Sequence, residues 1–179
     1  MTESEIYSPG LEGVIAGETA ISTVADGLRY RGYPVTELAE KGTFDEVAYL
    51  LLHGELPAVQ QLADFQKRIA AARCLPSPLI TLLGALPPAA SSMDVLRSAV
   101  SILAHFDPDT ADSSRAANLR KAERLLGQIP VAIAVHHRLI KGQPSLAARP
   151  DLSQAANFLY MLRGQEPSAA DTRALDVSL

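Results

Sequence analysis

The strongest constraint on the fold of this chain is an apolar segment inside a longer helical pattern. The helix is expected at about 115–141, and charged residues mark one face of its first part. From Leu125 to Val135, apolar side chains occur on every side of the helix rather than in one stripe. A helix that is apolar all round has to be covered on every side. The segment must therefore be buried in a packed helical core or against a partner.

Helical signals continue along most of the chain, with breaks at glycine and proline. Thr43 and Glu46 form the pattern of a capping box, and Gly54 ends the helix that follows. Asp151–Gln154 and Ser168–Asp171 are two further helix starts of the same kind. The sequence therefore predicts an all-α, mainly helical fold, with further helices at about 59–72, 77–86, 92–105 and 115–141.

The first 34 residues differ from the rest and predict a small β-hairpin element. Short strand-like runs occur at 13–16, 19–22 and 28–31. Ala25–Gly27 supplies a turn between the last two runs, because Asp-Gly tolerates the positive φ of a tight hairpin. We therefore divide the chain into a strand and hairpin segment at 1–34 and a helical domain at 35–179.

Composition narrows the class of protein. With 47% hydrophobic and 20% charged residues, the chain has the make-up of a globular domain. A net charge of −4 without a basic cluster argues against nucleic-acid binding by phosphate neutralisation. The apolar stretch 129–135 is too short to span a bilayer, and residues 1–8 lack the apolar run of a signal peptide. We expect a cytoplasmic protein with no nucleic-acid or membrane partner, and we interpret its single cysteine, Cys74, as a small apolar filler.

None of the four histidines predicts a catalytic or metal site from its neighbours in the sequence. His53 and His105 lie in the last turns of expected helices, where an imidazole suits the negative end of the helix dipole. His136 and His137 are adjacent, so on a helix their side chains point about 100° apart and do not face one metal ion. We expect no metal-binding residue among them.

The acidic residues are also interpreted as structural. Asp107, Asp109 and Asp112 have part of the spacing of a calcium loop, but the glycine and distal glutamate of an EF-hand are absent. We interpret this stretch as a solvated acidic turn. Carboxylate pairs on expected exposed helical turns are interpreted as cap and dipole complements: Glu37/Glu40 and Asp45/Glu46. The residues alone thus predict no catalytic, substrate-binding or metal site and no cofactor.

A series of short motifs occurs in a fixed order along the chain. They are Gly10–Ile15, Glu18–Ser22, Tyr30–Pro34, Tyr49–Pro57, Met93–Ser101, Ala117–Ala122, Ile129–Ala132, Ala155–Leu162 and Gly164–Pro167. Together they resemble the citrate synthase family, in the shorter prokaryotic form that includes 2-methylcitrate synthases. Ser91-Ser92 depart from the resemblance, since members commonly show His-Pro there. The resemblance extends from Gly10 to Leu179 and covers about the first half of a family member.

The resemblance implies an activity together with the absence of its catalytic groups from this chain. The family condenses an acyl-CoA, which is a co-substrate, with oxaloacetate. A carboxylate base removes a proton from the acyl group while a histidine polarises the thioester carbonyl. Those groups and the oxaloacetate-binding arginines lie in the second half of the family, so no catalytic residue is carried over to residues 1–179. The family's small domain would also be missing.

Three readings of the chain remain open at this stage. It can be the N-terminal half of a citrate or 2-methylcitrate synthase, as an expressed fragment or a truncated gene product. It can be one half of a split synthase completed in trans, or a non-catalytic helical protein that serves association or regulation. In each case we expect a homodimer through the helices near 92–105 and 115–141, which resemble dimer-interface helices of the family, or a contact with a missing C-terminal half.

Overall fold

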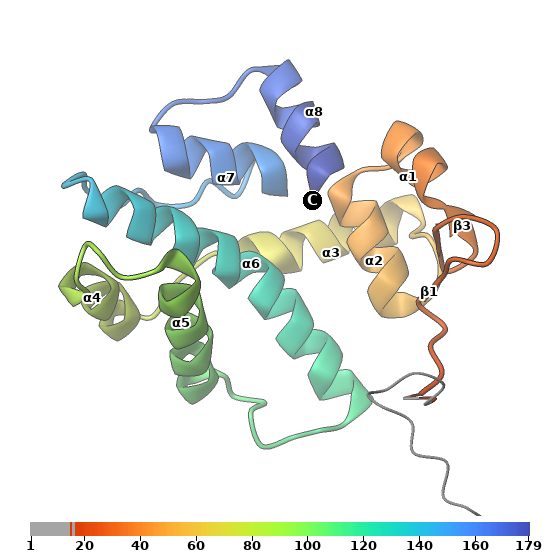
Figure 1. The fold of residues 1–179 in the computed structure, drawn as a ribbon, viewed down its shortest axis with the longest axis horizontal. Coiled ribbons are helices and arrows are strands. Elements are labelled where there is room, and N and C mark those ends of the chain that lie inside the picture. The colour runs from red at the N-terminus through yellow and green to blue at the C-terminus, as the bar shows by residue number, and fades with distance from the viewer. Residues whose placement is uncertain (1–14, 16) are drawn as a thin grey trace, which may run out of the picture.

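The middle of the structure is the long helix α6 (Arg115–Ile140), and the other helices pack around it (Figure 1). The computed structural model describes residue 15 and residues 17–179. Helices α4 (Ser77–Ala85) and α5 (Ser92–Phe106) lie against one side of α6, and α3 (Val59–Ala71) lies against another. Helix α7 (Gln154–Arg163) packs on α6 as well, and α8 (Ala169–Ser178) follows it. The mainly helical fold predicted from the sequence is confirmed.

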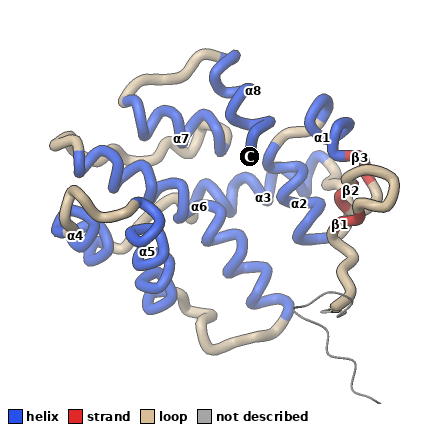
Figure 2. Tube along the Cα trace, viewed as in Figure 1, coloured by secondary structure: helices blue, strands red, loops and turns tan. Residues whose placement is uncertain are grey.

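The strands are confined to one edge of the molecule, beside α1 (Val35–Lys41) and α2 (Phe44–His53) (Figure 2). Strands β1 (Ser22–Thr23), β2 (Arg29–Tyr30) and β3 (Tyr33–Pro34) form an antiparallel sheet in that order. The predicted runs at 19–22 and 28–31 overlap β1 and β2, and the predicted turn connects them. The run at 13–16 lies outside the described residues except for residue 15.

Strand β3 was not predicted, and the reason lies in its second residue. Pro34 has no amide to donate to a sheet, so its sequence favours a break rather than a strand. In the structure Pro34 ends β3 and is also the N-cap of α1. Its position at the edge of the sheet makes the missing donor harmless.

Two of the three predicted helix caps are confirmed. The Thr43 hydroxyl accepts a hydrogen bond from the Glu46 amide, and the Glu46 carboxylate accepts one from the Thr43 amide at 2.8 Å. The Ser168 hydroxyl accepts from the Asp171 amide at 3.1 Å. Both side chains satisfy amides that have no partner within the helix.

The third cap was placed two residues too early. The N-cap of α7 is Ser153, not Asp151, and its hydroxyl accepts from the Ala156 amide. The buried Arg73 guanidinium donates to the carbonyl oxygens of Arg149 and Leu152, at 3.0 and 2.8 Å. Both carbonyls lie in the turn that precedes α7, so Arg73 connects this turn to the segment that follows α3.

The apolar segment 125–135 is covered largely by the chain itself. Two clusters of buried side chains are separated by α6. The larger joins α4, α5, α6 and α7 and includes Leu79, Leu83, Leu103, Ala134 and Met161; the smaller joins α2 and α3 and includes Tyr49, Phe65 and Ile69, with Leu126 against it. Within the segment, Ile133 is the residue left exposed. No helix in the described part of the chain is long and apolar enough to cross a membrane.

Helix α6 approaches α3 most closely at Gly127. A Cβ atom built on Gly127 would lie 2.7 Å from the Ile69 carbonyl oxygen and 2.9 Å from the Ala72 Cβ. Next to this point, the guanidinium of Arg68 donates two hydrogen bonds to the buried carboxylate of Glu123, at 2.7 and 3.0 Å. The absence of a side chain at Gly127 and the ion pair therefore fix α3 and α6 at one distance.

This contact generates a prediction for Gly127→Ala. Alanine normally stabilises a helix interior by about 0.5–1 kcal/mol relative to glycine. Here the added methyl has to displace backbone atoms of α3, and overpacking of this kind costs about 1–3 kcal/mol. We expect chemical denaturation to show a lower free energy of unfolding for Gly127→Ala.

Gly84→Ala is the matched control for this prediction. Gly84 lies in α4, and its added Cβ would make only an ordinary contact of 3.7 Å with Leu139. This variant should be as stable as the unmodified chain or more stable. Equal stabilisation by both substitutions would contradict a tight contact at Gly127.

Candidate functional site

An apolar groove lies where the first half of α5 faces the second half of α6. Its volume is about 230 Å³. The walls come from Val95, Leu96 and Ala99 of α5 and from Ala132, Ile133 and His136 of α6, with Leu83 of α4 contributing beside them. Small side chains at positions 99 and 132 leave the hollow between the two helices. Most of these side chains belong to the core, so the groove opens directly onto the interior of the domain.

Exposed apolar side chains border this groove. Met93 is 71% exposed, Ile140 is 41% exposed and Ile133 is 38% exposed, and all three line the hollow. Scattered apolar residues are normal on a protein surface, but a continuous apolar patch beside a hollow is typical of an interaction site. We define the groove and these three residues as the α5/α6 face.

The α5/α6 face also lacks acidic, lysine and arginine side chains. Burial lowers the pKa of His137, and the positive charges of Lys141 and Arg138 lower it further. His137 therefore stays neutral to a lower pH than an ordinary histidine. Both adjacent histidines line the groove, and the described residues contain no group of three side chains suited to a metal ion.

The structure gives His53 a carboxylate neighbour that the sequence did not reveal. Its Nε2 atom is buried, without a hydrogen-bond partner in the described part of the chain, and lies 3.7 Å from Glu123 Oε1. The ring stacks on Tyr49 with a centroid distance of 4.1 Å. Arg68 already donates two hydrogen bonds to Glu123, and these bonds raise the pKa of Arg68. This group of side chains joins α2, α3 and α6. The charges of Arg68 and Glu123 are paired with each other inside the domain.

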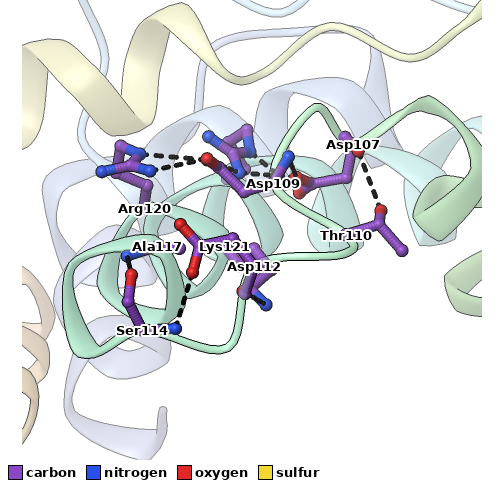
Figure 3. A network of polar contacts seen from close by, with 9 residues as sticks. Asp107, Asp109, Thr110, Asp112, Ser114, Ala117, Arg120 and Lys121 are labelled. Atoms are coloured by element: carbon purple, nitrogen blue, oxygen red, sulfur yellow. Dashed lines mark hydrogen bonds and ion pairs between the residues drawn. The ribbon is translucent and has the colours of Figure 1, made fainter.

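Two carboxylates of the acidic stretch between α5 and α6, those of Asp107 and Asp109, are paired with arginines of α6 rather than solvated (Figure 3). Asp112 is exposed, as expected. The Asp109 carboxylate accepts two hydrogen bonds from Arg120, at 3.0 and 2.6 Å. Arg124 donates to both Asp107 and Asp109. These hydrogen bonds hold the pKa of Asp107 and of Asp109 below its usual value. The oxygens of both carboxylates are bonded to arginines. We call this set of ion pairs the arginine clamp, since it holds the α5–α6 connection against α6.

The remaining candidates are dispersed, and two of them differ from expectation. Cys74 is exposed rather than an apolar filler. Asp45 is buried rather than exposed, since it accepts a hydrogen bond from Gln66 at 2.9 Å, and burial raises the pKa of its carboxyl group. His105 is exposed in the last turn of α5, as expected, and Glu37 pairs with Lys41. The structure does not bring these side chains together.

Comparison with known proteins is consistent across sequence and structure. A family model described as citrate synthase, C-terminal domain, matches residues 10–179. The citrate/2-methylcitrate synthase of Bacillus subtilis is 39% identical over 182 residues, covering 100% of this chain and 49% of its own length. The 2-methylcitrate synthase of Shewanella oneidensis is 42% identical, covering 98% of this chain and 47% of its own length.

A solved structure shows the same fold. Citrate synthase from Pyrobaculum aerophilum superposes with a TM-score of 0.88 at 34% identity, over 94% of this chain and 45% of that one. The chain therefore belongs to the citrate synthase family. It spans about half the length of the curated relatives that it matches.

The arginine clamp generates a prediction for Asp107→Asn. Asparagine keeps an oxygen for the Asp109 amide, which Asp107 accepts at 2.8 Å, but removes the charge that faces Arg124. Because the pKa of Asp107 is lowered in the folded state, its ionised form stabilises folding above about pH 4, and this stabilisation is lost as the pH falls through the lowered pKa. Denaturation at pH 7 should show a loss on the order of 1 kcal/mol, limited by solvent screening.

The pH dependence and a control variant test the origin of this effect. The difference between Asp107→Asn and the unmodified chain should shrink as the pH falls below about 4. Asp112→Asn is the control, because Asp112 also accepts from a backbone amide, that of Ser114 at 2.8 Å, but bonds no arginine within the described residues. An equal loss in both variants would show that the arginine contact contributes nothing.

Proposed function

We propose that this chain is the N-terminal portion of a citrate synthase-like acyltransferase. The whole enzyme would condense an acyl-CoA, either acetyl-CoA or alternatively propionyl-CoA, with oxaloacetate in the cytoplasm. The proposal is carried by one observation: the chain belongs to the family but spans only about half of its relatives. The strand segment at 1–34 and the helical domain at 35–179 would then form part of the large domain, and the small domain would lie in the other half.

This portion alone would have no synthase activity. General acid–base catalysis contributes about 10²–10⁴-fold for each positioned group. The family resemblance assigns the base, the polarising histidine and the oxaloacetate-binding arginines to the other half. The polar groups of the described residues support this, since Glu123 is bonded to Arg68, and Asp107 and Asp109 are bonded to arginines of α6.

The activity proposal predicts a simple result. Thiol release from acetyl-CoA or propionyl-CoA in the presence of oxaloacetate should equal the uncatalysed background for the purified chain. Adding a separate polypeptide that corresponds to the other half of the relatives should restore turnover. Turnover by the purified chain alone would contradict the proposal that the catalytic groups lie in the other half of the enzyme.

Two alternatives remain, and the gene neighbourhood distinguishes them. An adjacent gene for the second half would make this chain one part of a split synthase completed in trans. A reading frame that continues would make it a fragment of one enzyme. If neither is found, the apolar α5/α6 face favours a non-catalytic helical protein that serves dimerisation or regulation.

We further propose that the chain forms a homodimer through α5 and α6. The support is the α5/α6 face, on which Met93, Ile133 and Ile140 are exposed beside the groove. A two-fold dimer presents the same patch on both copies, and a patch without acidic, lysine or arginine side chains places no such charges against their own copies. Each Å² of apolar surface buried in this way contributes about 25 cal/mol, against the entropy cost of association.

The homodimer proposal predicts the behaviour of Ile133→Glu. A carboxylate on the rim of the groove would have to lose its hydration in the dimer, which is costly without a partner. Light scattering at micromolar concentration should therefore report a dimer for the unmodified chain and a monomer or aggregate for the variant. Val59→Glu is the control, because Val59 is exposed on α3 and does not line the groove. A monodisperse monomer for the unmodified chain would refute the homodimer.

A further inference from the structure

Helix α8 is attached to the rest of the chain with little apolar burial. It lies at the outside of the molecule, follows α7 and ends beside α1 and α2 (Figure 1). None of its residues is buried, whereas every other helix in the described part of the chain contributes buried residues. Val177 and Leu179 are 45% and 59% exposed, and they border a hollow of about 320 Å³ instead of filling it. Polar side chains therefore supply much of the attachment of α8.

Arg173 of α8 bonds the C-terminal end of α1. Its guanidinium donates hydrogen bonds to the carbonyl oxygens of Ala39 at 2.6 Å, Glu40 at 3.0 Å and Gly42 at 2.8 Å. Carbonyls in the last turn of a helix have no partner inside the helix, and they form the negative end of its dipole. A guanidinium suits this place because it combines a positive charge with several N–H donors in one plane. Arg173 therefore caps α1 from a helix that is more than 130 positions away in the sequence.

Asp176 of the same helix bonds the N-terminal end of α2. Its Oδ1 atom accepts a hydrogen bond from the Phe44 amide at 3.2 Å, and its Oδ2 atom accepts one from Arg173 at 3.2 Å. Phe44 is the first residue of α2, where the amides have no partner inside the helix and the dipole favours a negative charge. The side chain of Asp176 is only 13% exposed, so water competes little for these bonds. One turn of α8 thus joins the end of α1 to the start of α2.

We call Arg173, Asp176 and their bonds to α1 and α2 the α8 latch. Within the described residues, the other hydrogen bond from a side chain of α8 to a neighbouring element joins Asp171 to Arg163 of α7, at 2.6 Å. Both of these side chains are about half exposed, and ion pairs of this kind contribute little to stability. The main polar attachment of α8 is therefore concentrated at the junction of α1 and α2.

We propose that α8 is a strap that detaches as one unit from the folded domain, and that the α8 latch controls how much of the open state is populated. Regions with few buried apolar contacts open at a small cost in free energy while the rest of a protein stays folded. Arg173 and Asp176 lie on one turn of α8, so opening breaks both sets of bonds together. Opening also removes one wall of the hollow beside α1 and α2. This inference depends neither on the proposed activity nor on the proposed homodimer.

Hydrogen exchange followed by NMR measures the opening of α8. Under conditions in which exchange reports populations, amides bonded within α8 should share one protection factor, lower than the protection factors in α6 and α7. Protection that falls gradually toward Leu179 would show fraying of a helix end instead. Protection equal to that of α6 would show that α8 opens only when the whole domain unfolds. Either result would overturn the strap.

Arg173→Met tests the role of the α8 latch. Methionine keeps a long side chain but removes every hydrogen bond to α1. Bonds from a charged donor are stronger than those between neutral groups, so α8 amides should exchange about tenfold faster, with α6 unchanged. The Phe44 amide should also exchange faster, because it loses its acceptor whenever α8 is open. Equal acceleration in α6 and α8 would mean a general loss of stability and would contradict the latch.

Arg163→Met is the matched control. It makes the same substitution at the other ion pair of α8, in which both side chains are about half exposed. Exchange of the α8 amides should change by less than about twofold. An acceleration as large as that of Arg173→Met would contradict the assignment of the latch to the junction of α1 and α2.

Arg173→Lys keeps the test decisive if the methionine variant fails to fold. Lysine retains the positive charge, but its ammonium group lacks the planar fork that reaches three carbonyls of α1 and the residue after it. The α8 amides of this variant should therefore exchange faster than those of the unmodified chain, again with α6 unchanged. Exchange as slow as in the unmodified chain would overturn the role assigned to the guanidinium bonds.

Discussion

The close contact between α3 and α6 is the constraint on which the rest of this structure depends. Gly127 allows the two helices to approach until backbone atoms of α3 fill the place of a side chain. The Arg68–Glu123 ion pair spans the same interface and leaves the buried Glu123 carboxylate bonded. Because α6 also packs against α4, α5 and α7, its contact with α3 connects α3 to these three helices.

The packing around α6 leaves one side of this helix uncovered by the rest of the chain. The sides toward α3, α4 and α7 are covered within the chain, and Arg120 and Arg124 of its first half are paired with Asp107 and Asp109 (Figure 3). What remains is the side beside α5, where Ile133 and Ile140 are exposed. The apolar segment at 125–135 therefore belongs to the core along most of its surface, and Ile133 is the residue of the segment that is left exposed.

Helix caps that depend on residues close together in the sequence were predicted correctly from the sequence. The caps at Thr43 and Ser168 join residues only three positions apart, so they are readable from the sequence and were predicted correctly. The bonds of Arg73 to the turn before α7 join residues 76 and 79 positions apart, and in this turn the N-cap is Ser153 rather than the predicted Asp151. No local pattern encodes such a contact.

The same distinction applies to the functional groups. Adjacent histidines were visible at 136–137, but their shared position in a groove depends on how α5 packs on α6. His53 has no carboxylate nearby in the sequence, and Glu123 reaches it only through the α3–α6 contact. Acidic spacing at 107–112 gave no sign of arginine pairing, since the partners lie on the next helix.

The proposed homodimer through α5 and α6 is tested most directly by a distance measured between two copies of the chain. A nitroxide label at Arg97→Cys, an exposed position on α5, is placed in a Cys74→Ser background because Cys74 is exposed. The account predicts a resolved dipolar distance between labels on two copies, which Ile133→Glu abolishes. A dimer without such a dipolar signal, or one whose signal Ile133→Glu leaves unchanged, would contradict it.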